Sequence, residues 1–212
     1  MKYPEARLLV MSKAPEPGQV KTRLIPLLGA GGAAGLYAGL VHDCLQMSTT
    51  ADLCPVELWC SPSARHPFFR QCGTHYPVSL HCQPPGDLGQ RMSAALQSAL
   101  QRSAHAILIG TDCPTLSAAD IGKALDLLAG GNDAVLGPAA DGGYYLIGMK
   151  AHHGFVFRNM PWSSPAVLQV TEQRLRQHGL QWQRLAVHRD LDTADDYRAW
   201  KAAVAGSPAI PQ

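Results

Sequence analysis

The sequence predicts an α/β fold, a three-layer α/β/α sandwich whose mixed sheet is mostly parallel. Short apolar segments alternate with longer amphipathic segments along most of the 212 residues. Such alternation requires crossover connections, which favour parallel strands covered by helices on both faces. Two strand-like segments also follow one another around Gly142-Gly143, so some antiparallel pairing is expected there.

The strands are expected in short runs rich in β-branched, aromatic and other apolar residues. These runs lie at residues 7–12, 56–60, 78–82, 106–110, 134–138, 144–149 and 182–187. Helices are expected where apolar residues recur at helical spacing or where a capping residue precedes them. These segments lie at residues 32–47, 88–102, 118–128, 165–178 and 194–204.

The composition is that of a globular protein, with 46% hydrophobic and 16% charged residues. We expect one domain over residues 1–205 and a flexible tail at 206–212. The net charge of +2 is too small to argue for nucleic-acid binding. The N-terminal apolar run at residues 8–11 is too short for a signal peptide core or a spanning helix. A cytoplasmic protein with no membrane partner is therefore expected, and the sequence carries no signal for its oligomeric state.

Six cysteines are scattered along the chain without a Cys-x-x-Cys pair, which is typical of reduced thiols in a cytosolic protein. A zinc site on Cys72, His75, His81 and Cys82 is a weaker alternative. The neighbours His81 and Cys82 would point to opposite sides of a strand, which disfavours a shared ion.

The segment from Ile107 to Leu116 leads from a strand directly into Thr111-Asp112-Cys113-Pro114. Asp112 is therefore expected at the carboxyl end of a strand, where open α/β sheets bind ligands. Aspartate is a hard ligand for Mg²⁺ or Mn²⁺, whose other positions phosphate oxygens commonly fill. The alternative is a plain strand-to-helix turn, in which Pro114 ends the strand and Ser117 caps the next helix.

A basic loop follows the first strand at residues 13–24. It supplies the cations Lys13, Lys21 and Arg23 and, around Gly18, exposed backbone donors. These groups can neutralise a di- or triphosphate. The loop lacks the spacing of a P-loop or of the dinucleotide fingerprint, so neither nucleoside-triphosphate hydrolysis nor NAD binding is supported. A solvated basic surface loop is the alternative.

The motif Asp141-Gly142-Gly143-Tyr144 joins two expected strands. Its glycines would let the backbone approach a ligand, and Asp141 could accept hydrogen bonds from sugar hydroxyls. An Asp-Gly hairpin turn without any ligand explains the same residues.

Two alternate carboxylates, Asp190 and Asp192, follow the last expected strand. Alternation sends both to one side, so either could be a second metal ligand beside Asp112. Asp192, together with Thr193, could instead cap the helix that follows. We therefore favour Asp190 as the second ligand.

Two further residues are candidates for ligand contacts. Arg91 lies near a helix start, where the helix dipole disfavours a cation, and this placement indicates an anionic ligand. A surface arginine explains it equally well. Trp162 could form part of a lid or an acceptor site, or could belong to the core.

Taken together, the basic loop, Gly110-Thr111-Asp112-Cys113-Pro114, Asp141-Gly142-Gly143-Tyr144 and Asp190-Leu191-Asp192-Thr193 resemble the bacterial glycosyltransferases of nucleotide-diphospho-sugar transferase type. More distantly, the chain is similar to phospholactate and molybdenum-cofactor guanylyltransferases. The resemblance spans residues 9–197 and implies a GT-A-type fold with a Rossmann-like nucleotide half. The first loop departs from the Leu-Ala-Ala-Gly-Gly form of sugar nucleotidyltransferases. The resemblance therefore does not determine which base the protein binds or which bond of the nucleotide is broken.

The resemblance also implies roles for individual residues. Asp112 takes the place of the metal-binding acid, residues 141–144 face the acceptor or sugar, and Lys13, Gly18, Lys21 and Arg23 line the nucleotide phosphates. Beyond the resemblance, we expect Arg91 and Thr111 also to contact the nucleotide, and Trp162 to contact the acceptor or sugar.

The function expected first is a metal-dependent transferase that moves a sugar from a nucleotide to a small acceptor. A divalent ion on Asp112, with Lys21 and Arg23, would stabilise the leaving nucleoside diphosphate, and Asp141 is a candidate base. The first alternative is nucleotidyl transfer from a nucleoside triphosphate with release of pyrophosphate. The second is a nucleotide-binding module without turnover.

Overall fold

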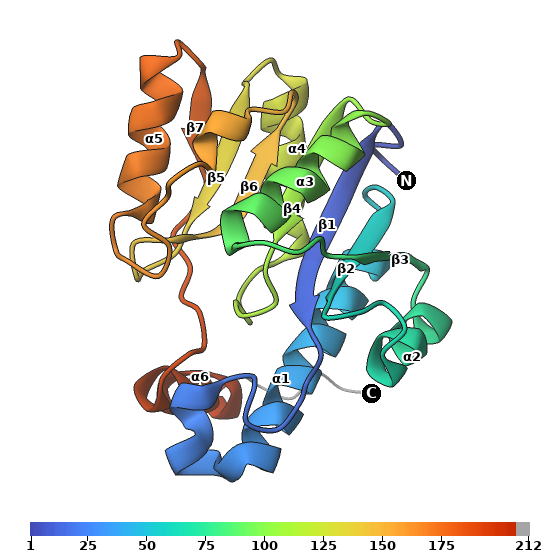
Figure 1. Cartoon of the computed structure of the whole chain (residues 1–212), viewed down its shortest axis with the longest axis vertical. Helices are drawn as coiled ribbons and strands as arrows, with labels where there is room; N and C mark the ends of the chain where they lie inside the picture. The colour runs from blue at the N-terminus through green and yellow to red at the C-terminus, as the bar shows by residue number, and fades with distance from the viewer. Residues whose placement is uncertain (207–212) are drawn as a thin grey trace.

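The computed structural model describes residues 1–206 and confirms the α/β sandwich with a mixed, mostly parallel sheet (Figure 1). Among these residues one sheet has the strand order β3-β2-β1-β4-β6-β5-β7. Strand β6 is antiparallel to both of its neighbours, whereas the other pairings are parallel. The strands are β1 (Ala6–Lys13), β2 (Val56–Ser61), β3 (Val78–Cys82), β4 (His105–Ile109), β5 (Ala134–Pro138), β6 (Tyr144–Met149) and β7 (Trp182–Arg184).

Helices cover both faces of the sheet because its central strands bury side chains on both sides. Leu8 and Ile107 pack in one core cluster, with residues of α1, α2 and α4. Leu9 and Leu108, their neighbours in sequence, pack on the other face with α3 and α5. The helices are α1 (Ile25–Thr50), α2 (Pro67–His75), α3 (Leu88–Leu100), α4 (Ala118–Ala129), α5 (Val167–Gln177) and α6 (Ala194–Gly206), with short 3-10 turns η1 (Thr22–Leu24) and η2 (Gly154–Val156).

Several elements differ from the sequence-based expectation, most of them by only one or two residues at an end. Helix α2 was not predicted, although Pro67 stands in its first turn and the His66 side chain accepts a hydrogen bond from the Phe68 N–H at 3.2 Å. Helix α1 begins before residue 32, across a kink at Gly29 whose φ is 70°. Strand β7 ends at Arg184 rather than at residue 187. Helix α6 extends to Gly206, and the rest of the tail expected at 206–212 lies outside the described residues.

The segment Thr22–Thr50 is long and apolar enough to cross a membrane by length and composition, with a hydropathy of 1.7. The sequence-based expectation considered only the apolar run at residues 8–11 and did not consider this segment. One face of α1 is buried in the core and includes Tyr37, Val41 and Leu45. Its outer face carries Gly31, Gly32, Gly35, Gly39, Asp43 and Gln46. The helix α1 packs one face in the core, and a core helix passes the same test of length and composition as a membrane-spanning one.

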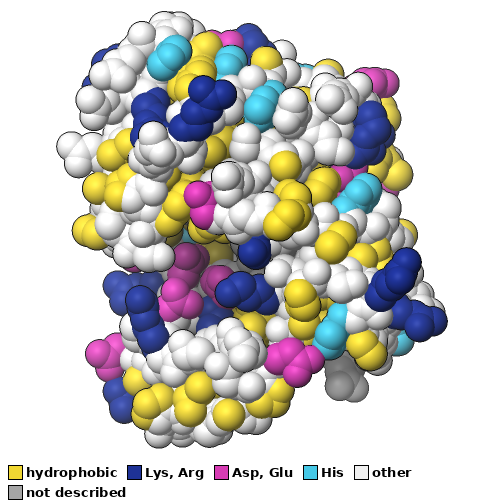
Figure 2. All heavy atoms as spheres, in the orientation of Figure 1, with side chains coloured by type: hydrophobic (Ala, Val, Ile, Leu, Met, Phe, Trp, Pro, Cys, Tyr) yellow, Lys and Arg dark blue, Asp and Glu magenta, His cyan; other side chains and the backbone are white. Residues whose placement is uncertain are grey.

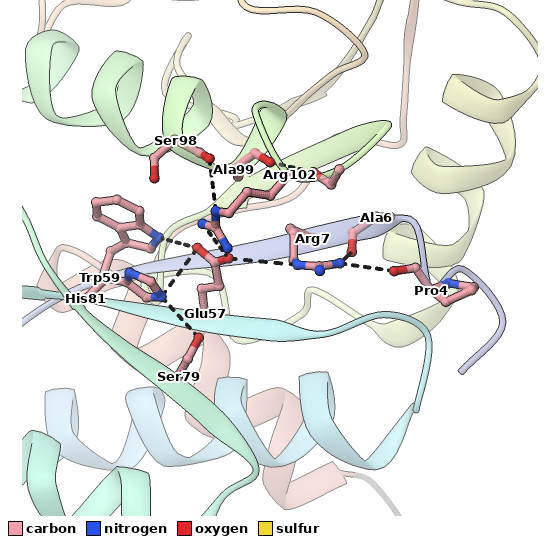
Figure 3. Close-up of polar contacts among 11 residues, drawn as sticks. Pro4, Ala6, Arg7, Glu57, Trp59, Ser79, His81, Ser98, Ala99 and Arg102 are labelled. Carbon is pink, nitrogen blue, oxygen red and sulfur yellow. Dashed lines mark hydrogen bonds and ion pairs between the residues drawn. The ribbon is translucent and has the colours of Figure 1, made fainter.

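A buried acid, Glu57 on β2, is surrounded by basic and aromatic groups on the α3 side of the sheet (Figure 3). It accepts hydrogen bonds of 3.1 Å from both Trp59 Nε1 and Arg102 Nη2. Arg7 Nε and His81 Nε2 lie 3.9 and 3.7 Å from its carboxylate. This network ties β1, β2, β3 and the end of α3 together, as a buried charge requires.

The chain changes direction between β1 and β4, and this change positions the site. From β1 the chain passes to β2 and β3 on one side, then crosses back to β4 on the other side of β1. The loops that leave the carboxyl ends of β1 and β4 therefore diverge and open a crevice. Below this edge α6 lies beside the start of α1 (Figure 1), where Leu24, Ala33, Leu40 and Leu191 form a separate small core.

Candidate active site

A cleft of about 770 Å³ opens at the carboxyl ends of β1 and β4. Figure 2 shows acidic and basic side chains gathered in a hollow between the main body and the part formed by α6 and the start of α1. Residues predicted from separate motifs meet on its walls. They are Lys13, Lys21, Arg23, Arg91, Asp112, Asp141, Gly143, Tyr144, Trp162, Asp190 and Asp192.

Three predicted site residues do not line the cleft. Thr111 is buried, and its Oγ1 donates to Tyr37 Oη at 3.3 Å. Gly142 has a φ of +91°, and a Cβ there would lie 2.2 Å from the Pro165 carbonyl oxygen. Gly18 also adopts a left-handed conformation, with a φ of +81°. In this structure these residues shape the loops around the cleft rather than its surface.

Lys21 lies at the centre of the charged groups, and its side chain is only 3% exposed. Its ammonium forms an ion pair with Asp112 Oδ1 and lies 2.9 Å from Asp192 Oδ1. Burial by itself lowers the pKa of Lys21, but the two carboxylates outweigh this effect and raise it above its ordinary value. The Lys21 ammonium is therefore charged and held by two acids from different motifs.

A backbone hydrogen bond joins the two acidic segments. The Leu191 N–H donates to the Asp112 carbonyl oxygen at 2.8 Å, and Asp190 and Asp192 flank this residue. Burial raises the pKa of Asp190 to about 7, and the neighbouring charges of Asp112, Asp192 and Asp141 act in the same direction. Lys21 opposes them. The cleft therefore concentrates negative charge that a cation would relieve.

The carboxylates of Asp112, Asp141, Asp190 and Asp192 line one cleft, and carboxylates are the type of ligand that a hard divalent cation takes. The buried Oδ1 of Asp112 faces the Lys21 ammonium, with which it forms an ion pair. Within residues 1–206, however, no three acidic, histidine or cysteine side chains already converge as a metal-binding group. The zinc alternative on Cys72, His75, His81 and Cys82 therefore does not assemble in the described chain.

Two other cations of the basic loop are exposed on the cleft wall, namely Lys13 and Arg23. Neither is among the ion pairs found in the described part of the chain, so both are free to contact an anion. Arg91 also lines the cleft. Its guanidinium is oriented by Nε, which donates to the Gly86 carbonyl oxygen at 2.9 Å, and by Nη1, 3.4 Å from Ser61 Oγ.

The Asp-Gly motif forms the hairpin turn that one interpretation predicted, and Asp141, Gly143 and Tyr144 also border the cleft. Strands β5 and β6 pair antiparallel around it, and Asp141 Oδ1 accepts a hydrogen bond from the Gly143 N–H at 2.9 Å. Asp141 is exposed and lines the cleft. Tyr144 and Trp162 meet edge to face with ring centroids 6.5 Å apart, and they form an aromatic wall on the same side.

The start of α6 shows that Asp192 does not have the capping role that the sequence offered for its side chain. Thr193 and Asp196 cap this helix reciprocally, because the Asp196 N–H donates to Thr193 Oγ1 at 3.2 Å and the Thr193 N–H donates to Asp196 Oδ2 at 2.8 Å. The helix therefore does not need the Asp192 side chain as its cap. That carboxylate pairs with Lys21 instead.

Residues 44–164 match the family described as "Uncharacterized protein conserved in bacteria (DUF2064)". The chain belongs to this family. Among solved structures it is similar to a protein from Desulfovibrio desulfuricans G20 that is provisionally named a nucleotide-diphospho-sugar transferase, with 31% identity and a TM-score of 0.87 over 96% of this chain and 89% of that one. No curated protein matches the sequence.

More distant structures share the fold of this DUF2064 protein. One is CMP:2-keto-3-deoxy-manno-octonic acid synthetase complexed with CTP, with 10% identity and a TM-score of 0.61 over 95% of this chain and 98% of that one. Another is glucosyl-3-phosphoglycerate synthase from Mycobacterium tuberculosis, solved with Mn²⁺, UDP and glucosyl-3-phosphoglycerate. It shares 12% identity and a TM-score of 0.52 over 92% of this chain and 75% of that one. The resemblance to nucleotide-diphospho-sugar transferases is thus confirmed for the fold.

Sequence reasoning missed two polar residues of the DUF2064 cleft. Tyr37 Oη accepts a hydrogen bond from the Lys13 N–H at 3.0 Å and one from Thr111, so it joins the ends of β1 and β4. Gln83 Nε2 donates to the carbonyl oxygens of Ser12 at 3.1 Å and Trp59 at 2.8 Å. Tyr37 lies on the apolar face of a helix, where the pattern indicates only core. Gln83 directly follows an expected strand, a position that could have marked it.

Proposed function

We infer that this protein is a metal-dependent transferase that uses a nucleotide-activated sugar to glycosylate a small acceptor. The observation that carries the proposal is the cleft at the switch point of the sheet, where acidic and basic side chains from four motifs meet. The likeness to the D. desulfuricans protein named a nucleotide-diphospho-sugar transferase supports the proposal, as do the Mn²⁺ and UDP in the structure of glucosyl-3-phosphoglycerate synthase.

A diphosphate is the donor group that best matches this charge pattern. Asp112, with Asp190 or Asp192, would hold Mg²⁺ or Mn²⁺, since carboxylates and phosphate oxygens together complete the shell of such ions. The ion would supply Lewis-acid stabilisation of the charge on the leaving nucleoside diphosphate. Lys13 and Arg23, exposed and free of ion pairs within the described residues, would bind the remaining phosphate oxygens.

The acceptor would lie on the side of the cleft formed by the β5–β6 hairpin. Asp141 is exposed there, and it is the candidate base for the hydroxyl of the acceptor. The aromatic wall of Tyr144 and Trp162 offers an apolar surface against which a sugar ring can pack. Glycosyl transfer needs no covalent intermediate, so these groups suffice.

Nucleotidyl transfer is the second candidate, because the same cations and metal ligands suit a triphosphate. The fold likeness to CMP:2-keto-3-deoxy-manno-octonic acid synthetase is closer than the likeness to the glucosyl transferase, with TM-scores of 0.61 and 0.52. In this reaction an acceptor group attacks the α-phosphate and pyrophosphate leaves. The two candidates therefore differ in the leaving group.

Ligand binding is the first test. Nucleoside triphosphates and nucleotide sugars are screened by thermal shift with Mn²⁺, with Mg²⁺ and with chelator. A ligand present at a hundredfold excess over its dissociation constant stabilises the protein by about 2.7 kcal/mol. The proposal predicts a shift that disappears with chelator and in Asp112→Asn but persists in Asp43→Asn, a control on the outer face of α1. Indifference of every ligand to metal would overturn it.

Product analysis is the second test. The ligand found by the screen is incubated with the protein and a panel of small hydroxyl, carboxyl and phosphate acceptors. Release of a nucleoside diphosphate supports glycosyl transfer, whereas release of pyrophosphate supports nucleotidyl transfer. Tight binding without any product under either metal would identify a binding module instead.

A further inference from the structure

The Lys21 ammonium lies between two of the acids proposed as metal ligands, Asp112 and Asp192. It forms ion pairs with Oδ1 of both acids, and the Lys21 side chain is 3% exposed. Asp112 and Asp192 are themselves 43% and 44% exposed. The side chains of Asp112 and Asp192 are thus partly exposed in the cleft, whereas the Lys21 side chain that pairs with them is buried.

We propose that Lys21 is a latch that responds to metal. Without a divalent cation its ammonium neutralises Asp112 and Asp192. When these carboxylates bind the cation, the ammonium leaves them and contacts the diphosphate in the cleft. The contact with a diphosphate rests on the proposed function, whereas the release of Lys21 from its two acids depends on the metal alone.

Charge repulsion is the reason for the exchange. The Lys21 ammonium and a divalent cation bound by the carboxylates of Asp112 and Asp192 would repel each other, because both positive charges would lie beside the same two acids. A divalent cation neutralises two carboxylates at once and also suits the acid-rich surroundings of Asp190 and Asp141. The Lys21 ammonium is therefore the group that has to move.

The local structure lets the side chain move while the backbone stays in place. Lys21 directly precedes η1, and its carbonyl oxygen accepts a hydrogen bond from the Leu24 N–H at 2.8 Å. Its stem has four rotatable carbons, and Lys21 itself lines the cleft beside Lys13 and Arg23. The flexible stem therefore allows the ammonium to turn toward the cleft wall that carries these two cations.

Lys21 thus differs from the other cations of the loop. Lys13 and Arg23 are exposed and take part in none of the ion pairs of the described residues, so they are available to an anion with or without metal. Lys21 becomes available only when its acids are occupied. The metal and the nucleotide should therefore bind cooperatively, beyond the direct contact between the ion and the phosphates.

The first arm of the test measures Mn²⁺ binding by calorimetry without nucleotide. It compares the natural protein with Lys21→Met and with Arg23→Met, a matched loss of one cation from the same cleft. The latch predicts that Lys21→Met binds Mn²⁺ about tenfold more tightly, whereas Arg23→Met changes the affinity by about threefold or less. Equal or weaker Mn²⁺ binding by Lys21→Met, or no Mn²⁺ binding by any of the three, overturns the proposal.

Folding of the variant is controlled separately. Lys21→Met removes the partner of two acids, so its melting temperature without metal should fall and should recover with Mn²⁺ more than that of the natural protein. If Lys21→Met does not fold, Lys21→Gln replaces it in both measurements, because its amide keeps a donor to the carboxylates without the charge.

The second arm measures the affinity for UDP, GDP, CDP and ADP with Mn²⁺ and with chelator. The latch predicts that Lys21→Met weakens diphosphate binding only with Mn²⁺, whereas Arg23→Met weakens it in both conditions. An equal loss for Lys21→Met in both conditions contradicts the latch. If the metal arm succeeds and no nucleotide binds, metal-driven release of Lys21 stands and the proposed function fails.

Discussion

The backbone N–H of Leu191 and the carbonyl oxygen of Asp112 are 2.8 Å apart and hydrogen-bonded. This bond brings a loop near the C-terminus against the turn that follows β4. The Leu191 side chain is 1% exposed and packs with Leu24, Ala33 and Leu40. Because Leu191 points into this small core, the carboxylates of its two neighbours are directed to the cleft.

Replacing Leu191 should therefore affect both stability and metal binding. Leu191→Ala removes a buried side chain and should lower the free energy of unfolding by about 2–5 kcal/mol. It should also weaken Mn²⁺ binding, because Asp190 and Asp192 lose their anchor. Urea denaturation and calorimetry measure the two effects. Leu125→Ala, on the buried face of α4 at 1% exposure, should reduce stability alone. Unchanged Mn²⁺ affinity in Leu191→Ala would refute the anchoring role.

The Tyr37 hydroxyl should contribute to stability as the link between the ends of β1 and β4. Tyr37→Phe leaves the Lys13 N–H and Thr111 Oγ1 without the acceptor that they use in the structure. The expected loss is about 1–3 kcal/mol in the free energy of unfolding. Tyr3→Phe is the control, since the Tyr3 hydroxyl bonds to Asp126 at the surface. Equal and small losses in both variants would contradict the assigned role of Tyr37.

Gly142 should tolerate no side chain, for two separable reasons. Its φ of +91° disfavours any other residue, and a Cβ would lie 2.2 Å from the Pro165 carbonyl oxygen. Gly131 has a φ of +104°, and a Cβ added there would meet no atom within 4 Å, so Gly131→Ala measures the conformational cost alone. Gly142→Ala should lower the free energy of unfolding by about 1–3 kcal/mol more than Gly131→Ala does. Equal losses in urea denaturation would show that the segment at Pro165 moves away freely.

The buried Glu57 network should support the fold without affecting the cleft. Glu57→Ala removes a side chain that is 3% exposed and leaves Arg7 without its partner. The expected destabilisation is about 3–5 kcal/mol if the loss follows that of other buried pairs. Arg7 and Arg102 are 22% and 46% exposed, so hydration should reduce the loss toward the lower end. Mn²⁺ affinity, measured below the denaturation transition, should stay unchanged, and a change would link this network to the site.

Part of the fold could be predicted from the sequence because its signals are local. The strands β3, β5 and β6 have the predicted bounds, and Ser117 caps α4 as expected. Helix α2 escaped prediction because its nine residues give the periodicity too few turns to be recognised. The kink at Gly29 hides the start of α1 for a similar reason, since the helical spacing is interrupted there.

The alternation of strands and helices, and the charged residues at the strand ends, can be recognised in the sequence because spacing and residue type act over a few neighbouring positions. How these residues combine depends on the folded chain. The strand order places β1 beside β4, and the anchoring of Leu191 brings Asp192 to Lys21. Such contacts depend on packing between segments distant in the chain, and no local pattern encodes that a buried ammonium will face two acids rather than solvent.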